Sequence, residues 1–263
     1  MTSPITVVKI GGSTLGQHDT SLDDLAALHA EGQRLVVVHG GGATITDWLA
    51  QHNIESRFVH GLRATDERAL EVVVAVLAGL VNKRLVAELQ GRGARAFGLS
   101  GADGALLRAR RYDEELGFVG EIVSVDGDRL RAIIEGETIA VLAPIAVEVE
   151  DGTLRPQLLN VNADTAAGEV AAALHAKRLV FLTDVPGVLD SAGTVCSRLS
   201  ASEARKLLET QAVTGGMIPK VEAALSAVAA GAQAVITDGR QAGALLGLLS
   251  GEQTASQGGT SIG

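Results

Sequence analysis

The chain has 263 residues, of which 46% are hydrophobic and 20% carry a charge. This length supports one large domain or two lobes with a sizeable core, and the composition excludes a disordered or low-complexity protein. Acidic residues outnumber basic ones by 31 to 22, the formal net charge is −9, and 2% of the residues are aromatic. An acidic chain with few aromatic rings is a poor partner for nucleic acid or for an anionic membrane surface.

The sequence also indicates the cellular compartment. Cys196 is the single cysteine, so an intrachain disulfide is excluded and a reducing compartment is suitable. The longest uncharged apolar run, residues 72–81, is about half of the ~20 residues that cross a bilayer. The chain starts with Met-Thr-Ser-Pro, without the basic and apolar regions of a signal peptide. We expect a cytoplasmic protein without a membrane partner.

Short β-branched runs alternate with segments of helical periodicity through the first hundred residues. In chain order, the predicted elements are a strand at 5–9, a helix at 22–31, a strand at 34–39, a helix at 43–52, a long helix at 66–90 and a strand at 96–99. The breaks between them fall at glycines, which are typical of turns.

The rest of the chain adds hairpins and then returns to the alternating pattern. Between residues 106 and 125 we expect hairpins with turns near 113–115 and at 126–127, followed by a helix at 129–135, a strand at 138–143 and a hairpin turn at 151–152. A helix begins just after residue 164, and then come a strand at 178–182, helices at 201–209 and 218–231, a strand at 234–236 and a helix at 242–249. This pattern predicts an α/β fold with a mainly parallel sheet covered on both faces. We expect two lobes that share the sheet and divide near residues 175–177.

Two glycine clusters directly follow predicted strands: Gly11-Gly12 and Gly40-Gly41-Gly42. Open α/β sheets bind ligands at the carboxyl ends of their strands, where bare backbone comes close to an anion. A tight strand-to-helix turn explains either cluster by itself equally well, but two clusters on early strands favour anion binding. Neither is a Walker A loop or a Gly-x-Gly-x-x-Gly fingerprint, which disfavours a P-loop nucleotidase and a dinucleotide-dependent dehydrogenase.

Two lysines stand where an anionic ligand would bind. Lys9 ends an apolar strand just before Gly11-Gly12, and an unpaired buried ammonium group there would be costly, so it should face the ligand edge. Its alternative role is that of a lysine whose charged end reaches solvent past the strand. Lys220 follows a glycine-containing loop, Gly215 to Pro219, and by itself is either a phosphate-binding cation or an ordinary residue of a first helical turn.

Polar residues before a predicted helix form a further candidate group. Asn160, Asn162 and Asp164 alternate with apolar residues, and capping the helix needs only one such side chain. Arg63 lies between Gly61 and the helix-capping candidate Thr65. It is either an arginine that binds a carboxylate of a ligand or an ordinary surface arginine. No grouping of histidine with cysteine or glutamate has metal-ligand spacing, and no Gly-x-Ser-x-Gly elbow indicates a nucleophile.

In chain order, these segments resemble the amino acid kinase family, and within it the N-acetyl-L-glutamate kinases. The match covers nearly the whole chain. The matching segments are residues 8–13 (VKIGGS), 38–42 (VHGGG), 61–65 (GLRAT), 82–83 (NK), 98–104 (GLSGADG), 117–120 (GFVG), 160–164 (NVNAD), 182–188 (LTDVPGV) and 215–220 (GGMIPK).

The resemblance implies an open αβα sandwich with two lobes that share one sheet. Residues 1–175 are expected to bind the acyl amino acid and to form a homodimer, and residues 176–263 are expected to bind ATP. Lys9 and Lys220 match the lysines that stabilise the transferring phosphoryl group, and Asp164 matches the aspartate that orients them. The positions that match the acceptor site are Gly41, Gly42, Arg63 and Asn160. Those assigned to the nucleotide site are Gly11, Gly12, Asp184, Val185, Pro186, Gly187, Val188, Leu189, Ala212, Val213 and Thr214.

The implied reaction moves the γ-phosphoryl group of ATP to the side-chain carboxylate of N-acetyl-L-glutamate, the second step of arginine biosynthesis. A carboxylate with a reference pKa of about 4.3 is already ionised at neutral pH, so no general base is needed. The reaction needs positioning and charge neutralisation, which lysines, glycine N–H groups and Mg²⁺ supply. We expect the nucleotide phosphates and water to hold the Mg²⁺, and we predict no protein metal ligand.

Two other functions stay open at this point. The family also contains kinases for aminoadipate or glutamate on a carrier protein, in lysine or arginine biosynthesis, which usually have extra basic residues before the acceptor arginine. Residues 57–63 (RFVHGLR) contain no such insertion, and the full pattern of residues 160–164 is present. The other alternative is a non-catalytic ligand-binding regulator of the same fold. The presence of Lys9, Asp164 and Lys220 disfavours it.

The first residues lead to an expectation about regulation. Arginine-inhibited members of the family have an additional N-terminal helix that links dimers into a hexamer. Here the first predicted strand is preceded by Met1 to Pro4, which is too short for a helix because a first turn fixes several dihedrals for one hydrogen bond. We expect a homodimer that arginine does not inhibit.

Overall fold

The computed structural model describes residues 3–11, 20–59, 61–190, 192–250 and 259–263. Among these residues, one eight-stranded sheet runs in the order β12–β14–β13–β11–β1–β2–β8–β5. Neighbouring strands are parallel except β13 and β14, which are antiparallel. The strands are β1 (Ile5–Ile10), β2 (Arg34–His39), β5 (Ala96–Ser100), β8 (Ile139–Ala143), β11 (Arg178–Thr183), β12 (Arg198–Leu199), β13 (Gln233–Asp238) and β14 (Gly259–Ile262).

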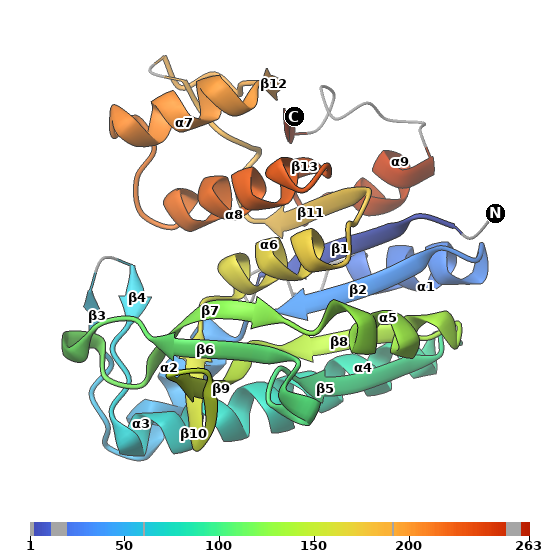
Figure 1. Cartoon of the computed structure of the whole chain (residues 1–263). Helices are drawn as coiled ribbons and strands as arrows, with labels where there is room; N and C mark the ends of the chain where they lie inside the picture. The colour runs from blue at the N-terminus through green and yellow to red at the C-terminus, as the bar shows by residue number, and fades with distance from the viewer. Residues whose placement is uncertain (1–2, 12–19, 60, 191, 251–258) are drawn as a thin grey trace.

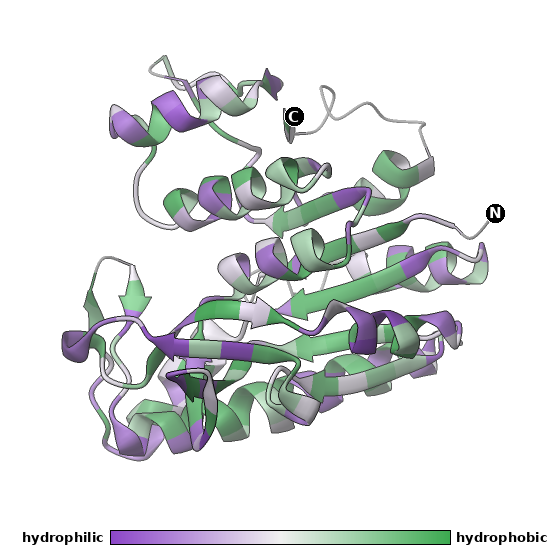
Figure 2. Ribbon diagram, viewed as in Figure 1, coloured by the Kyte–Doolittle hydropathy of each residue, from purple (hydrophilic) through white to green (hydrophobic). Residues whose placement is uncertain are grey.

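Helices cover both faces of this sheet (Figure 1). One face packs against α5 (Gly127–Glu135), α6 (Ala163–Ala173), α7 (Ala201–Glu209) and α8 (Met217–Ala229). The other packs against α1 (Ser21–Ala30), α2 (Gly42–Gln51), α3 (Glu67–Val74), α4 (Asn82–Gly91) and α9 (Ala244–Ser250). The central strands are apolar along most of their length (Figure 2), because successive residues serve opposite faces and both faces are buried. The predicted open αβα sandwich is confirmed.

The two halves of the chain share this sheet as predicted. β11, the first strand after residue 177, pairs with β1 in parallel register, with Val8 opposite Val180. The boundary that we predict near residues 175–177 falls in the turn between α6 and β11, where His175 has a φ of 47°. The division into lobes at that turn stays a prediction.

The hairpins of the middle third form a separate closed barrel. Its strands are β6 (Leu107–Arg111), β7 (Val119–Val125), β9 (Ile145–Glu150) and β10 (Thr153–Val161). The turn at Asp151–Gly152 is confirmed, since β9 and β10 pair on either side of it. The turn expected at residues 126–127 is wrong: the Asp126 carboxylate accepts from Arg129 N at 3.0 Å, so Asp126 caps α5.

The predicted long helix at 66–90 is continuous but not uniform. A π-helix (Ala75–Val81) separates α3 from α4, and hydrophobic periodicity does not reveal such a segment. The capping expectation for Thr65 is wrong, because Asp66 caps α3 by accepting from Ala69 N at 2.8 Å. A short hairpin of β3 (Phe58–Val59) and β4 (Leu62–Arg63) was not predicted. Among the described residues, no helix has the length and apolar character needed to cross a membrane.

Candidate active site

The carboxyl ends of β1 and β2 open onto a cavity of about 180 Å³. Ligands of open α/β proteins bind at this edge of the sheet. The cavity is also bounded by the N-termini of α2 and α6 and by the β3–β4 hairpin. Its lining includes all but one of the residues predicted for catalysis and acceptor binding: Lys9, Gly41, Gly42, Arg63, Asn160 and Asp164. The exception, Lys220, joins this group through Asp164.

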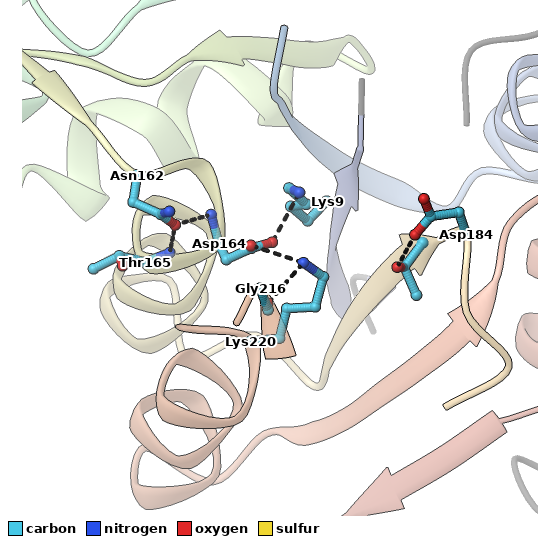
Figure 3. A network of polar contacts seen from close by, with 8 residues as sticks. Lys9, Asn162, Asp164, Thr165, Asp184, Gly216 and Lys220 are labelled. Carbon is cyan, nitrogen blue, oxygen red and sulfur yellow. Dashed lines mark hydrogen bonds and ion pairs between the residues drawn. The ribbon is translucent and has the colours of Figure 1, made fainter. Parts of the chain in front are cut away.

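Lys9 and Lys220 converge on the Asp164 carboxylate (Figure 3). Lys9 Nζ lies 2.8 Å from Oδ1, and Lys220 Nζ donates to Oδ2 at 3.0 Å. Lys220 Nζ also donates to Gly216 O at 3.2 Å. The three side chains are at most 14% exposed. Two ammonium groups on one buried carboxylate leave an unbalanced positive charge beside the cavity, which favours an anionic ligand.

The sequence places Asp164 at this point by capping α6 with a different residue. Asn162 Oδ1 accepts from the backbone N–H groups of Asp164 at 2.8 Å and Thr165 at 3.1 Å. The Asp164 side chain is therefore not needed as a cap and turns to the lysines instead. Its position in the first helical turn also favours the charged carboxylate, because the N-terminal end of a helix carries partial positive charge.

The crossing of α6 and α8 brings Lys220 to Asp164. A methyl group on Gly168 of α6 would lie 2.7 Å from Ala223 O and 2.8 Å from Ala223 Cα in α8. The two backbones are therefore in direct contact, about one helical turn beyond Asp164 and Lys220. Glycine at residue 168 is what allows the helices to come this close.

Gly41 and Gly42 form the start of α2 at the edge of the cavity. Among the described residues, no hydrogen-bond partner is found for the backbone N–H groups of Gly41, Gly42, Ala43 and Thr44. These are the N–H groups that a helix leaves without intrahelical partners, and they suit an anion. A methyl group on Gly41 would lie 2.7 Å from Leu77 Cδ2, so the Leu77 side chain would have to shift.

Arg63 is held against the glycine loop by several contacts. Its Nη2 donates to Gly42 O at 3.0 Å and to Thr46 Oγ1 at 2.9 Å, and its Nη1 donates to Ser56 Oγ. The guanidinium carbon also lies 4.6 Å from the centre of the Phe58 ring. Burial lowers the pKa of Arg63, although a guanidinium stays charged in proteins. The arginine is thus a positioned cation on the cavity wall.

Asn160 points into the same cavity from β10. Its Nδ2 donates to Thr65 Oγ1 at 3.1 Å, and Thr65 Oγ1 in turn donates to Arg63 O at 2.8 Å. No partner is found within the described ranges for the Asn160 side-chain oxygen. Thr65 therefore links the side chain of Asn160 to the backbone of Arg63 in β4. The side-chain oxygen of Asn160 is left as an acceptor for an N–H group of a ligand.

Known proteins match this chain along most of its length. The model of the amino acid kinase family matches residues 4–238. The chain belongs to the amino acid kinase family. A similar curated protein, the acetylglutamate kinase of Dehalococcoides mccartyi (strain ATCC BAA-2266 / KCTC 15142 / 195), is 45% identical over 240 residues, or 90% of this chain and 87% of that protein. The acetylglutamate kinase of Methanopyrus kandleri is 45% identical over 259 residues, or 94% of this chain and 98% of that protein.

A solved structure shows the same fold at lower identity. The crystal structure of smu.665 from Streptococcus mutans UA159 has a TM-score of 0.80 and 28% identity, and the match covers 98% of each chain. This amino acid kinase therefore has the family architecture as well as the family sequence pattern.

The predicted nucleotide positions that the structure describes do not line the cavity at the carboxyl ends of β1 and β2. Gly11 N donates to Leu182 O at 3.3 Å where β1 and β11 end, and Gly12 lies outside the described residues. Asp184, Val185, Pro186 and Leu189 are exposed after β11, as are Ala212 and Thr214 before α8. Asp184 stands apart from the lysines in Figure 3, and its Oδ1 accepts from Thr183 Oγ1 at 3.3 Å.

Three of the predicted nucleotide positions are buried. Gly187 has a φ of 151°, and a methyl group there would lie 2.6 Å from Thr260 Oγ1. The Val188 side chain belongs to the core, and its N–H and C=O groups are bonded to Thr260 Oγ1 and Cys196 N. Val213 is also a core residue. We expect these residues to shape the loops whose exposed neighbours are available to a nucleotide.

Some residues that build the site were not predicted for it. Thr46, Ser56 and Thr65 support Arg63 and Asn160, and their small hydroxyl side chains give no distinguishing signal in a sequence. His39 and Asn82, which lie within matched family segments, form a buried contact behind the glycine loop. Within the described ranges, no group of three histidine, cysteine, aspartate or glutamate side chains is arranged to hold a metal ion.

Proposed function

We propose that this chain is an ATP-dependent kinase that phosphorylates the side-chain carboxylate of N-acetyl-L-glutamate, in arginine biosynthesis. The observation that carries the proposal is the Lys9–Asp164–Lys220 group, which adds positive charge to a small cavity with unpartnered N–H groups. Relatives that match nearly the whole chain at 45% identity are acetylglutamate kinases. A volume of about 180 Å³ is smaller than the roughly 300–1,000 Å³ of drug-sized pockets, which suits a small acceptor.

The proposed chemistry needs no proton transfer from the acceptor. One oxygen of the ionised γ-carboxylate attacks the γ-phosphorus of ATP, the bond to the bridging oxygen breaks, and ADP leaves with that electron pair. The product is N-acetyl-L-glutamyl 5-phosphate, an acyl phosphate. Both reactants are anions, so the protein contributes orientation and positive charge rather than a base.

The lysines and aspartate divide this work. Lys9, at the end of β1, and Lys220, in the first turn of α8, approach the transferring phosphoryl group from opposite sides of Asp164. Asp164 holds both ammonium groups at fixed positions before the substrates arrive. Such preorganised charge lowers the barrier because it is not reorganised during the reaction.

The acceptor is proposed to bind among Gly41, Gly42, Arg63 and Asn160. The glycine N–H groups and the Arg63 guanidinium receive the carboxylates of acetylglutamate. The free amide oxygen of Asn160 accepts from the acetamido N–H group. These assignments use the donors and acceptors that the protein leaves open at the cavity.

ATP is proposed to bind mainly to the lobe formed by residues 176–263, beside the carboxyl end of β11, and to reach the end of β1 in the other lobe. Its contacts are Gly11, Gly12, the segment from Asp184 to Leu189, and Ala212 to Thr214. Mg²⁺ accompanies the nucleotide and neutralises its phosphates, since this ion keeps several water ligands and binds through substrate phosphates. The protein residues then orient the acceptor against the nucleotide.

A homodimer formed through residues 1–175 is part of the proposal. β5 is an edge strand of the main sheet, with β8 as its one neighbour in the described sheet order. Phe97 on this strand is 55% exposed. An unprotected edge with an exposed aromatic ring is a surface that natural proteins usually cover. A cytoplasmic location is also proposed, because the reaction consumes ATP.

A kinase assay tests the proposed function and its alternatives together. Purified protein is mixed with ATP, Mg²⁺ and hydroxylamine, which traps an acyl phosphate as a hydroxamate. We expect hydroxamate with N-acetyl-L-glutamate as the sole acceptor. Product formed only with aminoadipate or glutamate on a carrier protein would support the carrier-linked alternative. Binding of acetylglutamate without hydroxamate formation would support a non-catalytic regulator.

A further inference from the structure

A buried contact between His39 and Asn82 lies behind the glycine loop. Both side chains are fully buried. His39 ends β2, immediately before Gly40, and its Nδ1 lies 3.0 Å from Gly40 O. Its Nε2 lies 3.1 Å from Asn82 Nδ2, at the start of α4. The histidine thus connects the first peptide of the glycine loop to a helix on the face of the sheet.

The surrounding acceptors and donors assign the hydrogens of this contact. Asn82 Nδ2 also lies 2.9 Å from Val141 O and 3.3 Å from Leu99 O, and Asn82 Oδ1 accepts from Lys83 Nζ at 3.0 Å. The amide is therefore oriented with its NH₂ group toward His39. Because Asn82 donates, His39 Nε2 accepts, and the imidazole proton lies on Nδ1, where it donates to Gly40 O.

We propose that His39 and Asn82 are positioning residues that orient the Gly40–Gly41–Gly42 backbone for binding of the acceptor carboxylate. This inference rests on the proposed function. The Gly40 carbonyl belongs to the peptide whose N–H group is that of Gly41. Holding that carbonyl with a fixed donor therefore also fixes the direction of the Gly41 N–H group at the cavity. His39 and Asn82 do not themselves line the cavity.

The π-helix explains how one segment reaches two parts of the loop. Leu77, inside the π-helix, contacts Gly41, where a methyl group would lie 2.7 Å from Leu77 Cδ2. Asn82 follows the last π-helical residue directly and contacts His39. π-helical segments occur frequently at functional sites. This one supports the glycine loop at neighbouring residues.

Gly98 on β5 leaves space for the side chains of Asn82 and Lys83. A methyl group there would lie 2.2 Å from Asn82 Oδ1, 2.7 Å from Val86 Cγ2 and 2.9 Å from Lys83 Nζ, while Gly98 O accepts from Lys83 Nζ at 3.0 Å. Gly98 is not part of the cavity lining. Substituting it should displace Asn82 together with Val86, and neither residue lines the cavity.

The electrostatic surroundings maintain the neutral imidazole that this arrangement needs. The pKa of His39 is lowered to about 4: burial is the main cause, the Gly40 carbonyl raises the pKa in part, and the positive charge of Lys83 adds a smaller lowering effect. His39 therefore keeps an accepting Nε2 at neutral pH. A buried polar network with this geometry also stabilises the core, so the test must separate positioning from stability.

Kinetics of isosteric variants provide that separation. His39→Asn keeps an N–H group near the Nδ1 position but loses the contact with Asn82, whereas His39→Leu loses both contacts. We expect the KM for acetylglutamate to rise about threefold in His39→Asn and about tenfold in His39→Leu. The KM for ATP and the kcat should change less than about twofold, because the loop binds the acceptor in the ground state.

Two further variants control for stability and for folding failure. Leu89→Ala, a fully buried substitution on α4, should lower the Tm and leave both KM values unchanged. Gly98→Ala tests the support if His39→Leu does not fold, and it should raise the KM for acetylglutamate alone. The proposal is overturned if the His39 and Gly98 variants keep a normal KM for acetylglutamate, or if both KM values rise equally.

Nitrogen NMR of the imidazole gives a test that does not need enzyme activity. In ¹⁵N-histidine-labelled wild-type protein at neutral pH, we expect His39 with a protonated Nδ1 and an unprotonated Nε2. Acetylglutamate should shift the Gly41 and Gly42 amide signals in wild type and shift them less in His39→Leu. A protonated Nε2 would refute the proposed positioning role of His39 and Asn82, even if the protein is an active kinase. Binding with these shifts but no hydroxamate would instead refute the proposed function alone.

Discussion

The proposed acceptor cavity and the predicted nucleotide region lie at the carboxyl ends of the same sheet but are built differently. At the cavity, Lys9, Arg63 and Asp164 are buried and each has a protein partner. Beyond β11, Val185 is 36% exposed and Leu189 is 43% exposed. The acceptor side is therefore formed before a ligand arrives, whereas the nucleotide side presents open loops.

The two regions must be held in a fixed relative position for phosphoryl transfer, and the contacts of Asp164 join them. The buried group of Lys9 and Asp164 belongs to β1 and α6, and Lys220 reaches it from α8, on the nucleotide side. The contact of Gly168 with Ala223 supports the same crossing. Substitutions at the coupling should thus reduce turnover, while substitutions at the cavity wall should weaken acceptor binding alone.

The largest effect on activity is expected at Lys9 and Lys220, the two lysines that contact Asp164. Lys9→Ala or Lys220→Ala should lower kcat by roughly 10²–10³, with smaller effects on either KM, because the charge they stabilise develops during transfer. Steady-state kinetics measure this, with Lys206→Ala, an exposed lysine on α7, as control. A variant with near-normal kcat would remove that lysine from the mechanism.

The second prediction concerns how the free energy of unfolding depends on pH, and it rests on His39, which is buried behind the glycine loop. The folded-state pKa of His39 is about 4, below the reference pKa of about 6.5 in the unfolded chain. The unfolded state therefore binds a proton first as pH falls, so stability present above about pH 6.5 is lost between that pH and about 4. The loss from this group is about 3 kcal/mol.

Urea unfolding at a series of pH values checks the His39 effect. Wild type should lose more free energy of unfolding between pH 7 and pH 4.5 than His39→Asn does. His52→Asn removes an exposed histidine and should follow the wild-type profile. Identical pH profiles for wild type and His39→Asn would show that His39 is not held neutral in the folded protein.

The third effect tests the helix crossing. Gly168→Ala should lower kcat by between about tenfold and 10²-fold, because the added methyl group pushes α8 and Lys220 away from Asp164. Alanine is otherwise the better helix former, so a loss cannot come from helix propensity. Gly91→Ala in α4, where a methyl group meets nothing within 4 Å, is the matched control. Equal kcat in the two variants would exclude the crossing as the coupling.

The smallest effect is expected at the cavity wall. Arg63→Lys should raise the KM for acetylglutamate about tenfold and leave the KM for ATP within about twofold, since an ammonium group lacks the planar fork of donors. It cannot replace the simultaneous bonds to Gly42, Thr46 and Ser56. Arg57→Lys changes an arginine whose side chain is 54% exposed and serves as control. Equal changes in both KM values would place Arg63 outside the acceptor site.

Much of the fold was predictable because the strands are short, β-branched and bounded by glycine. The helix at Ala201–Glu209 has its predicted bounds, and a capping box of Ser200 and Glu203 explains its start. The π-helix, the β3–β4 hairpin and the closure of the barrel were not predictable. The barrel closes through pairing of strands far apart in the chain, such as β7 with β10, and the short hairpin and the π-helix have no distinctive hydrophobic periodicity.

The sequence by itself determined the residue types of the site: lysines and glycines at strand ends, and an aspartate behind its own capping asparagine. These are local choices, made by strand termination and by helix capping. Only the tertiary structure decided which of these groups meet. Asp164 lies between Lys9 and Lys220 because a glycine lets two helices touch. His39 reaches Asn82 because parallel strands and a π-helix bring residues far apart in the chain into one buried contact.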